Sequence, residues 1–166
     1  MSDSSDPTAP ITRIKTPMRL DYRVTAGSNR ARFLRALVDG KIFGQRCTQC
    51  KKVYVPPRGC CPTCGISDSE SVELADHGTV TTFALINIPF DNQAFQLPYG
   101  AAAILLDGAD LPLLHLLNNV PVEEIRMGLR VKAVWGPDPK PTLETIQWFE
   151  ASGEPDADYD SYKEHL

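Results

Sequence analysis

The sequence predicts a mainly β protein that begins with one helix. Three observations support this fold class. Residues 78–149 contain five short runs rich in β-branched and aromatic side chains, residues 28–38 repeat apolar side chains at helical spacing, and the segment between them is dominated by cysteine, proline and glycine. Apolar residues make up 42% and charged residues 23% of the chain, which is typical of a globular protein.

The N-terminal part of the chain divides into a tail and a helical segment. The first 20 residues begin with a polar run that lacks the apolar periodicity of a folded element, so a disordered tail is expected there. Within residues 21–40, four apolar side chains fall on one helical face: Phe33, Leu34, Leu37 and Val38. Ser28 suits the N-cap of this helix, and Gly40 suits its end. The apolar face must be buried, either against the rest of this chain or against a partner subunit.

Residues 41–72 form a cysteine-rich segment that is too short to build a hydrophobic core of its own. It contains two C-x-x-C pairs separated by ten residues. Such pairs fold into two tight turns that bring four thiolates to the corners of a tetrahedron, and four sulfur ligands favour zinc. The sequence therefore predicts a closed, structural zinc site with the ligands Cys47, Cys50, Cys61 and Cys64.

Other uses of these cysteines fit the sequence less well. Rubredoxin-type iron takes the same four ligands, but nothing else in the chain indicates electron transfer. Disulfides are not expected in a chain without a signal peptide, and a dithiol redox motif leaves the second pair unexplained. Cys60 directly precedes Cys61, but its spacing from Cys64 suits a metal-binding turn less well, so Cys60 is predicted not to be a ligand.

Residues 73–151 are predicted to form the β domain. The five strand candidates are residues 79–88, 99–106, 111–117, 129–135 and 143–149. Residues 107–110 read as a hairpin connection, and residues 122–126 as a helical turn. This order is compatible with a small Greek-key barrel of the OB type and equally with an ordinary sandwich. The connection 89–98 carries Phe90 and Phe95, which either contact a ligand or partner or pack across one end of a barrel.

Charge is strongly segregated along the chain. Residues 13–58 carry a net charge of +10, residues 59–149 carry −7, and the C-terminal tail, residues 152–166, is acidic. A basic stripe of this kind attracts phosphate or an acidic protein surface, although it is also compatible with a merely solvated surface. The acidic tail, with Tyr159 and Tyr162 among its charges, is expected either to be disordered or to dock on a partner.

No catalytic constellation is visible, and no catalytic residue is predicted. The three histidines are His77 beside a turn, His115 within an apolar strand and His165 in the acidic tail. Glu123 and Glu124 are adjacent and point apart, and the chain has no G-x-S-x-G, glycine-rich phosphate loop or H-E-x-x-H. The chain also lacks an apolar run of roughly 20 residues and a signal-peptide core, so a soluble cytoplasmic protein is expected.

Several motifs resemble a known family. The run RCTQCKKVYVPPRGCCPTCG and the later segments DHGTVTTFALI, LPYGAAAILLD and IRMGLRVKAVW are similar to the zinc-ribbon/OB-fold family known as domain of unknown function 35, over residues 28–148. The most specific parts are P-P-R at residues 56–58 and P-Y-x-x-A at residues 98–102. The resemblance implies an N-terminal helix, a rubredoxin-like zinc ribbon and a five-stranded OB-fold barrel. The chain departs from the family at Cys60, where members usually have an apolar residue.

The resemblance also implies a function. Members of this family resemble small non-catalytic partners of thiolase-like enzymes, including acyl-CoA thiolases, lipid-transfer-type thiolases that act as retro-aldolases in steroid side-chain breakdown, and related synthases. The catalytic residues are then expected on the partner, in a heterotetramer with two copies of each chain and the acyl-CoA at or near the interface. The phosphates of coenzyme A suit the basic segment, whose nearest candidates are Arg46, Lys51, Lys52 and Arg58.

Two other functions compete with this one. OB barrels and zinc ribbons both occur in proteins that bind single-stranded nucleic acid, but such binding needs aromatic residues on a positive barrel face, and residues 59–149 are negative. A self-contained enzyme is the third possibility, and it is disfavoured because the sequence shows no acid, base and nucleophile in combination.

Overall fold

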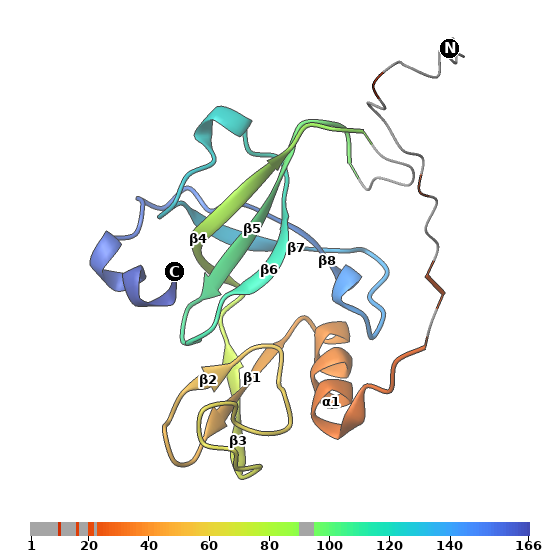
Figure 1. The fold of residues 1–166 in the computed structure, drawn as a ribbon, viewed down its shortest axis with the longest axis vertical. Coiled ribbons are helices and arrows are strands. Elements are labelled where there is room, and N and C mark those ends of the chain that lie inside the picture. Colours follow the sequence, from red (N-terminus) through yellow and green to blue (C-terminus); the bar gives the residue numbers. More distant parts are fainter. Residues whose placement is uncertain (1–9, 11–15, 17–19, 22, 90–94) are drawn as a thin grey trace.

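The computed structural model describes residues 10, 16, 20–21, 23–89 and 95–166. In this part of the chain, one helix leads into a three-stranded sheet, which is followed by a closed five-stranded barrel (Figure 1). The structure thus confirms the predicted mainly β class and favours the barrel over the sandwich. The tail predicted for residues 1–20 lies almost entirely outside the described residues, and so does Phe90.

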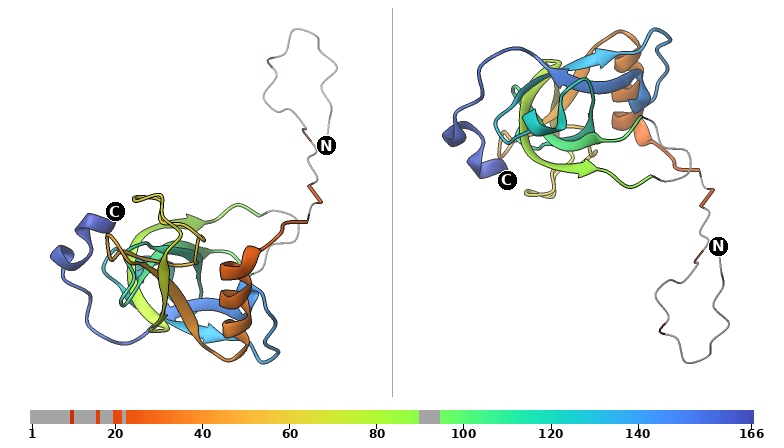
Figure 2. Two further views of the ribbon diagram at one scale, coloured as in Figure 1. Left: turned by 90° about the horizontal axis from the view of Figure 1, so that it is seen from below. Right: turned by 90° about the horizontal axis from the view of Figure 1, so that it is seen from above.

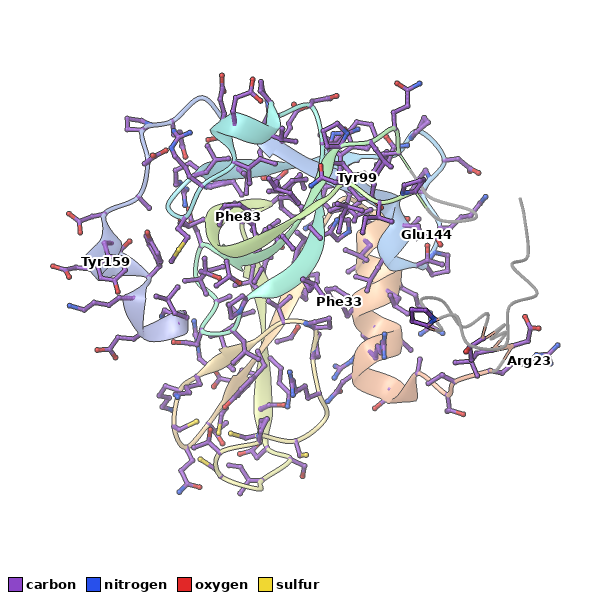
Figure 3. All side chains as sticks on the ribbon, turned by 45° about the horizontal axis from the view of Figure 1, so that its top comes forward. Arg23, Phe33, Phe83, Tyr99, Glu144 and Tyr159 are labelled. Carbon is purple, nitrogen blue, oxygen red and sulfur yellow. The ribbon has the colours of Figure 1, made fainter. Side chains whose placement is uncertain are left out.

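The helix α1, Gly27–Val38, packs against this chain's own body. Phe33 and Leu37 are completely buried and belong to the same core cluster as the barrel interior. Figure 3 shows Phe33 between the helix and the barrel. Gly40 ends the helix as predicted, with a φ of +69° that an L side chain rarely adopts. Ser28 is not the N-cap: the helix begins at Gly27, after Ala26, and has no side-chain cap, so Ser28 lies within its first turn.

The cysteine-rich segment contains a sheet that the sequence analysis did not identify. Its antiparallel strands occur in the order β2-β1-β3 and are β1 (Ile42–Cys47), β2 (Val53–Tyr54) and β3 (Ser69–Leu74). Ile42, Val53 and Val55 belong to the core cluster that also holds Phe33 and the barrel interior. The ribbon therefore shares its core with the helix and the barrel.

The barrel closes through the strand order β4-β5-β6-β8-β7. All its pairs are antiparallel except β6 with β8. The strands are β4 (His77–Ile86), β5 (Tyr99–Leu106), β6 (Leu113–Leu117), β7 (Arg130–Trp135) and β8 (Ile146–Ala151). Gly78 is required where β4 runs between β5 and β7, because a Cβ atom there would collide with the backbone of Leu105.

Several predicted boundaries differ from the structure by one to three residues. The helical turn is present as the 3-10 helix η1, Val122–Glu124, but the last strand candidate begins three residues too early. Leu143–Thr145 forms a second 3-10 helix, η2, because the Thr145 hydroxyl bonds to both the amide and the carbonyl of Lys140 and closes a turn. Phe95, at the described end of the long connection, packs edge-on against Tyr99 and Trp148.

The C-terminal segment, expected to be disordered or to dock on a partner, instead packs on this chain's own barrel. It contains two short 3-10 helices, η3 (Tyr159–Ser161) and η4 (Lys163–His165), and Tyr162 between them is only 5% exposed. The amide of Ala157 donates to the carbonyl of Gly128 at 2.8 Å. Figure 2 shows this segment and α1 on opposite sides of the barrel. Among the described residues, no helix is both long and apolar enough to cross a membrane.

Candidate metal centre and basic surface

The first metal-binding turn connects β1 to β2. Cys47 is the last residue of β1, and its carbonyl accepts a hydrogen bond from the amide of Lys51 at 3.0 Å. The Cys47 amide donates to the carbonyl of Lys52 at 3.0 Å, and Lys51 has a φ of +64°. These contacts turn the chain back sharply, so that Cys50 points toward Cys47.

The second turn repeats this geometry fourteen residues further along the chain. The Gly65 amide donates to the Cys61 carbonyl at 2.8 Å, and the Cys61 amide donates to the Ile66 carbonyl at 2.8 Å. Gly65 has a φ of +71°, which explains why glycine follows the second pair. The Cys64 amide points at Cys61 Sγ, 3.4 Å away.

The two turns bring the four predicted ligands together. Their Sγ atoms all lie within 4.8 Å of one another, and Cys50 Sγ is 3.6 Å from Cys61 Sγ. A tetrahedral metal ion with metal–sulfur bonds of about 2.3 Å requires sulfur–sulfur distances similar to these. The four cysteines, which lie in a rubredoxin-like ribbon, are thus positioned to bind one metal ion. Cys60 is exposed and lies outside the cluster.

The surroundings of the sulfur cluster are closed and mostly apolar. Cys47 and Cys61 are each 1% exposed and pack with the buried Tyr54, beside Ile66 and Leu111. A site of four sulfur ligands has no position left for water or substrate. Such an ion stabilises the fold and supplies no catalytic chemistry.

The thiols differ in their acidity. The Tyr54 hydroxyl lies 3.4 Å from Cys61 Sγ, and its hydrogen bond lowers the pKa of Cys61 to about 6. Loss of contact with water raises the pKa of Cys64 to about 12, helped by hydrogen bonds that its thiol donates to the neighbouring cysteine sulfurs. A bound divalent cation favours the thiolate form of every ligand, so metal binding releases protons from this cluster.

The loop that carries Arg58 is fixed by a buried glutamine. Gln45 is 4% exposed, and its Oε1 accepts hydrogen bonds from the amides of Arg58 and Gly59, both at 3.0 Å. The sequence analysis did not identify Gln45. The available signal was weak, since it consisted of one polar residue among the apolar residues that precede the first cysteine.

The four basic residues predicted to bind phosphate do not converge on one cavity. Lys51 and Lys52 lie in the first turn, and Arg46 lies on β1. Arg58 lines a cavity of about 670 Å³ together with Arg30 and the first turn of α1. Sequence reasoning missed Arg30 because the two arginines come from elements 28 residues apart.

Ion pairing differs sharply between the basic and acidic regions. In the part of the chain that the structure describes, the five basic residues after Arg58 all contact a carboxylate: Arg126, Arg130, Lys132, Lys140 and Lys163. Within the same described part, no ion pair forms on Arg30, Arg46, Lys51, Lys52 or Arg58. The positive charge that is available to a ligand or partner therefore lies on the helix and the ribbon.

The most connected charged group of the barrel is Arg130. It makes two hydrogen bonds of 2.7 Å to the Asp107 carboxylate and one of 3.0 Å to Glu154, which belongs to the C-terminal segment. These bonds lower the pKa of Asp107 and raise the pKa of Arg130. His77 Nε2 lies 3.3 Å from the same carboxylate. The network ties β4, β5, β7 and the C-terminal segment together.

The remaining candidate groups lie apart from one another. Burial lowers the pKa of His115, whose ring packs against Phe149 and whose Nδ1 is buried without a hydrogen-bond partner. His165 Nδ1 lies 3.0 Å from the carbonyl of Asp110. Glu123 and Glu124 are exposed in η1. Among the described residues, these groups form no catalytic constellation.

Comparisons with known proteins agree with the two-part architecture. The family model described as "ChsH2, rubredoxin-like zinc ribbon domain" matches residues 35–70, and the model described as "ChsH2, C-terminal OB-fold domain" matches residues 71–136. A "DUF35 domain-containing scaffold protein" of Methanocaldococcus jannaschii is 30% identical over 95 residues, which are 57% of this chain and 67% of that protein.

Another relative is much longer than this chain. A "Probable enoyl-CoA hydratase alpha subunit" of Thermomonospora curvata is 31% identical over 128 residues, which are 76% of this chain but 40% of that protein. The chain therefore spans less than half the length of this relative.

Two solved structures share the fold. The structure described as "Ltp2-ChsH2(DUF35) aldolase" has a TM-score of 0.62 and 27% identity, covering 78% of this chain and 99% of that one. A DUF35 protein of unknown function from Sulfolobus solfataricus has a TM-score of 0.57 and 20% identity, covering 76% of this chain and 87% of that one. The solved structures share the fold, and the matched domains and the scaffold relative show that the chain belongs to the DUF35 family of zinc-ribbon/OB-fold proteins.

Proposed function

We propose that this chain is a non-catalytic accessory subunit of a thiolase-like enzyme, and that it supports thiolysis or retro-aldol cleavage of an acyl-CoA. The observation that carries the proposal is a contrast within the described residues. They hold a closed sulfur centre and a basic surface whose Arg30, Arg46, Lys51, Lys52 and Arg58 form no ion pair. One described cavity is lined by Asp107, Ser161 and His165, but each of these is bonded to another group: Asp107 to Arg130, Ser161 to the carbonyl of Asp158 and His165 to the carbonyl of Asp110. The solved relative described as an aldolase of Ltp2 and ChsH2(DUF35) supports the same role.

The metal in this proposal is a structural Zn²⁺ ion held by Cys47, Cys50, Cys61 and Cys64. The ion keeps the two turns rigid. Metal binding is needed for this because the ribbon has little apolar core around the cysteines. The ion holds Lys51, Lys52 and Arg58 on a fixed frame. Zinc is preferred to iron because the family model that matches this region describes a zinc ribbon.

The acyl-CoA contact is the second part of the proposal. Arg58, together with Arg30 beside the 670 Å³ cavity, offers two guanidinium groups to the phosphates of coenzyme A. Arg46, Lys51 and Lys52 add positive charge around the first metal-binding turn. We propose that the acyl group itself reaches the active site of the partner, and that a steroid side chain is one such acyl group.

The assembly expected is a cytoplasmic heterotetramer with two copies of each chain. Co-expression with a thiolase-like enzyme of the same organism, followed by size-exclusion chromatography with light scattering, tests this directly. The two proteins should co-elute at the mass of two copies of each. Elution of this chain alone, at every salt concentration tried, would contradict the proposal.

The charge of the barrel disfavours the nucleic-acid alternative. The described basic residues of the barrel are all engaged by carboxylates, so the barrel does not offer a positive face to a phosphate backbone.

A further inference from the structure

The outer side of the β4–β5–β6 sheet has no role in the fold described so far. Strand registers place Ala103 opposite both Thr82 and Leu114, and directly opposed residues of antiparallel strands point to the same side of a sheet. The next row on that side, by the same registers, consists of Ala84, Ala101 and Leu116. We call these six residues the sheet face.

The sheet face points outward and carries no charge. The alternate residues of β5, Ala102 and Ile104, are 0% exposed and point into the barrel. Leu114 is 74% exposed, and Thr82 and Ala84 are exposed as well. An antiparallel sheet with one side toward water normally carries polar residues on that side. A contiguous apolar surface in this position is typical of a protein contact.

The shape of the sheet face suits close approach by another protein. Its three alanines add little bulk to the surface, and Leu114 on β6, at 74% exposed, is its most exposed large side chain. Large apolar side chains that become fully buried supply much of the energy of an interface, whereas small neighbours allow tight packing around them. Figure 1 shows the three strands side by side on one side of the barrel.

Acidic residues flank the sheet face. The helix η1 lies on the β4 side and η2 on the opposite side of these strands (Figure 1), and they carry the exposed residues Glu123 and Glu144. Within the described residues, neither carboxylate forms an ion pair. The complementary surface on a partner is therefore apolar at its centre and basic at its rim.

We propose that the sheet face is the docking surface for the thiolase-like enzyme, so this inference rests on the proposed function. A second copy of this chain is a poor occupant, because two acidic rims would meet. The basic residues of the described barrel are already held by its own carboxylates and offer no compensation. The partner contributes an apolar patch that receives Leu114, surrounded by lysine or arginine residues that face Glu123 and Glu144.

The test uses charge placed on two different strands of the sheet face. Leu114→Glu and Thr82→Glu should each weaken binding to the co-purified thiolase-like enzyme by about 30-fold or more, as for residues central to an interface. Leu166→Glu is the matched control, because Leu166 is also an exposed apolar residue at 55% but lies at the C-terminus, away from these strands. Affinity is measured by isothermal titration calorimetry, with zinc content and circular dichroism confirming that each variant is folded.

Each result has a distinct meaning. Equal affinity of the wild type, both variants and the control would overturn the sheet face as the docking surface and leave the proposed function standing. Failure of the wild type itself to bind would instead overturn the proposed function. If the wild type alone forms a dimer that Leu114→Glu dissociates, while enzyme binding is unchanged, the sheet face is an interface between two copies and the inference is wrong.

Discussion

At the scale of single residues, the four ligands and Cys60 form a natural comparison. Replacing Cys64 by serine removes one of four thiolates, and structural zinc sites contribute on the order of 10 kcal/mol that is also folding energy. We expect Cys64→Ser to lose most of its zinc and residues 41–72 to lose amide protection in hydrogen exchange. Cys60→Ser should keep about one zinc per chain, since Cys60 is exposed and outside the cluster. Equal zinc content in the two variants would contradict the ligand assignment.

Asp107 gives a prediction about acid stability. Arg130 lowers its pKa below the ordinary value of 3.8, so the folded state binds a proton less readily than the unfolded state. Its stabilising contribution is present above pH 3.8 and is lost as the pH falls through the lowered pKa. Asp107→Asn should lower the Tm at pH 7 and lose less further stability than the wild type between pH 4 and pH 2, as followed by thermal melts.

The control for this experiment is Asp138→Asn. Asp138 forms an exposed ion pair with Lys140, with side chains 78% and 67% exposed, and such pairs contribute little. Its melts should overlay those of the wild type across the pH range. An Asp107→Asn variant that behaves in the same way would show that the Arg130 network does not stabilise the barrel.

At the scale of elements, Asp110 joins three parts of the chain. It lies between β5 and β6, its carboxylate accepts from the Val53 amide at 2.7 Å, and its own amide donates to the Val53 carbonyl at 2.9 Å. The Asp110 carbonyl also meets His165 Nδ1 at 3.0 Å. The ribbon strand β2, the barrel hairpin and the C-terminal helix η4 therefore depend on one residue for their relative positions.

Asp110→Ala should loosen this joint. Loss of a part-buried hydrogen bond to a carboxylate costs about 2 kcal/mol, which lowers the Tm of a chain of this size by roughly 4–8 °C. The amide of Val53 should exchange faster with deuterium, while amides in the middle of β5 keep their protection. Asp138→Ala serves as the control, and an unchanged Val53 exchange rate would show that Asp110 does not hold the ribbon to the barrel.

The elements also show where sequence reasoning works and where it stops. The five barrel strands were found because their apolar and β-branched residues repeat locally, and the metal cluster was found because its ligand spacing is itself local. The strands β1, β2 and β3 were missed because turn-forming residues dominate their neighbourhood, and β2 has only two residues. Arg30 and Gln45 were missed because their roles depend on contacts with a loop far along the chain.

At the scale of the whole molecule, the hydrophobic core is shared by the helix, ribbon and barrel, whereas unpaired charge is not. The helix, ribbon and barrel share one hydrophobic core, so they move as one body rather than as separate modules. Charge, by contrast, is divided. Apart from the Lys41–Glu73 pair, the described cations of the helix and ribbon form no ion pair, whereas those of the barrel pair with carboxylates. We infer that the basic residues of the helix and ribbon bind the phosphates of an acyl-CoA and that the sheet face binds the enzyme.

The most direct test of an accessory role is the rate of acyl-CoA cleavage. It is measured for the partner enzyme alone, for the enzyme with increasing amounts of this chain, and for this chain alone. The account predicts that the rate rises with added chain, saturates at one copy per enzyme subunit, and is absent for this chain alone. Cleavage by this chain in isolation, or an enzyme whose rate and mass do not change when the chain is added, would contradict it.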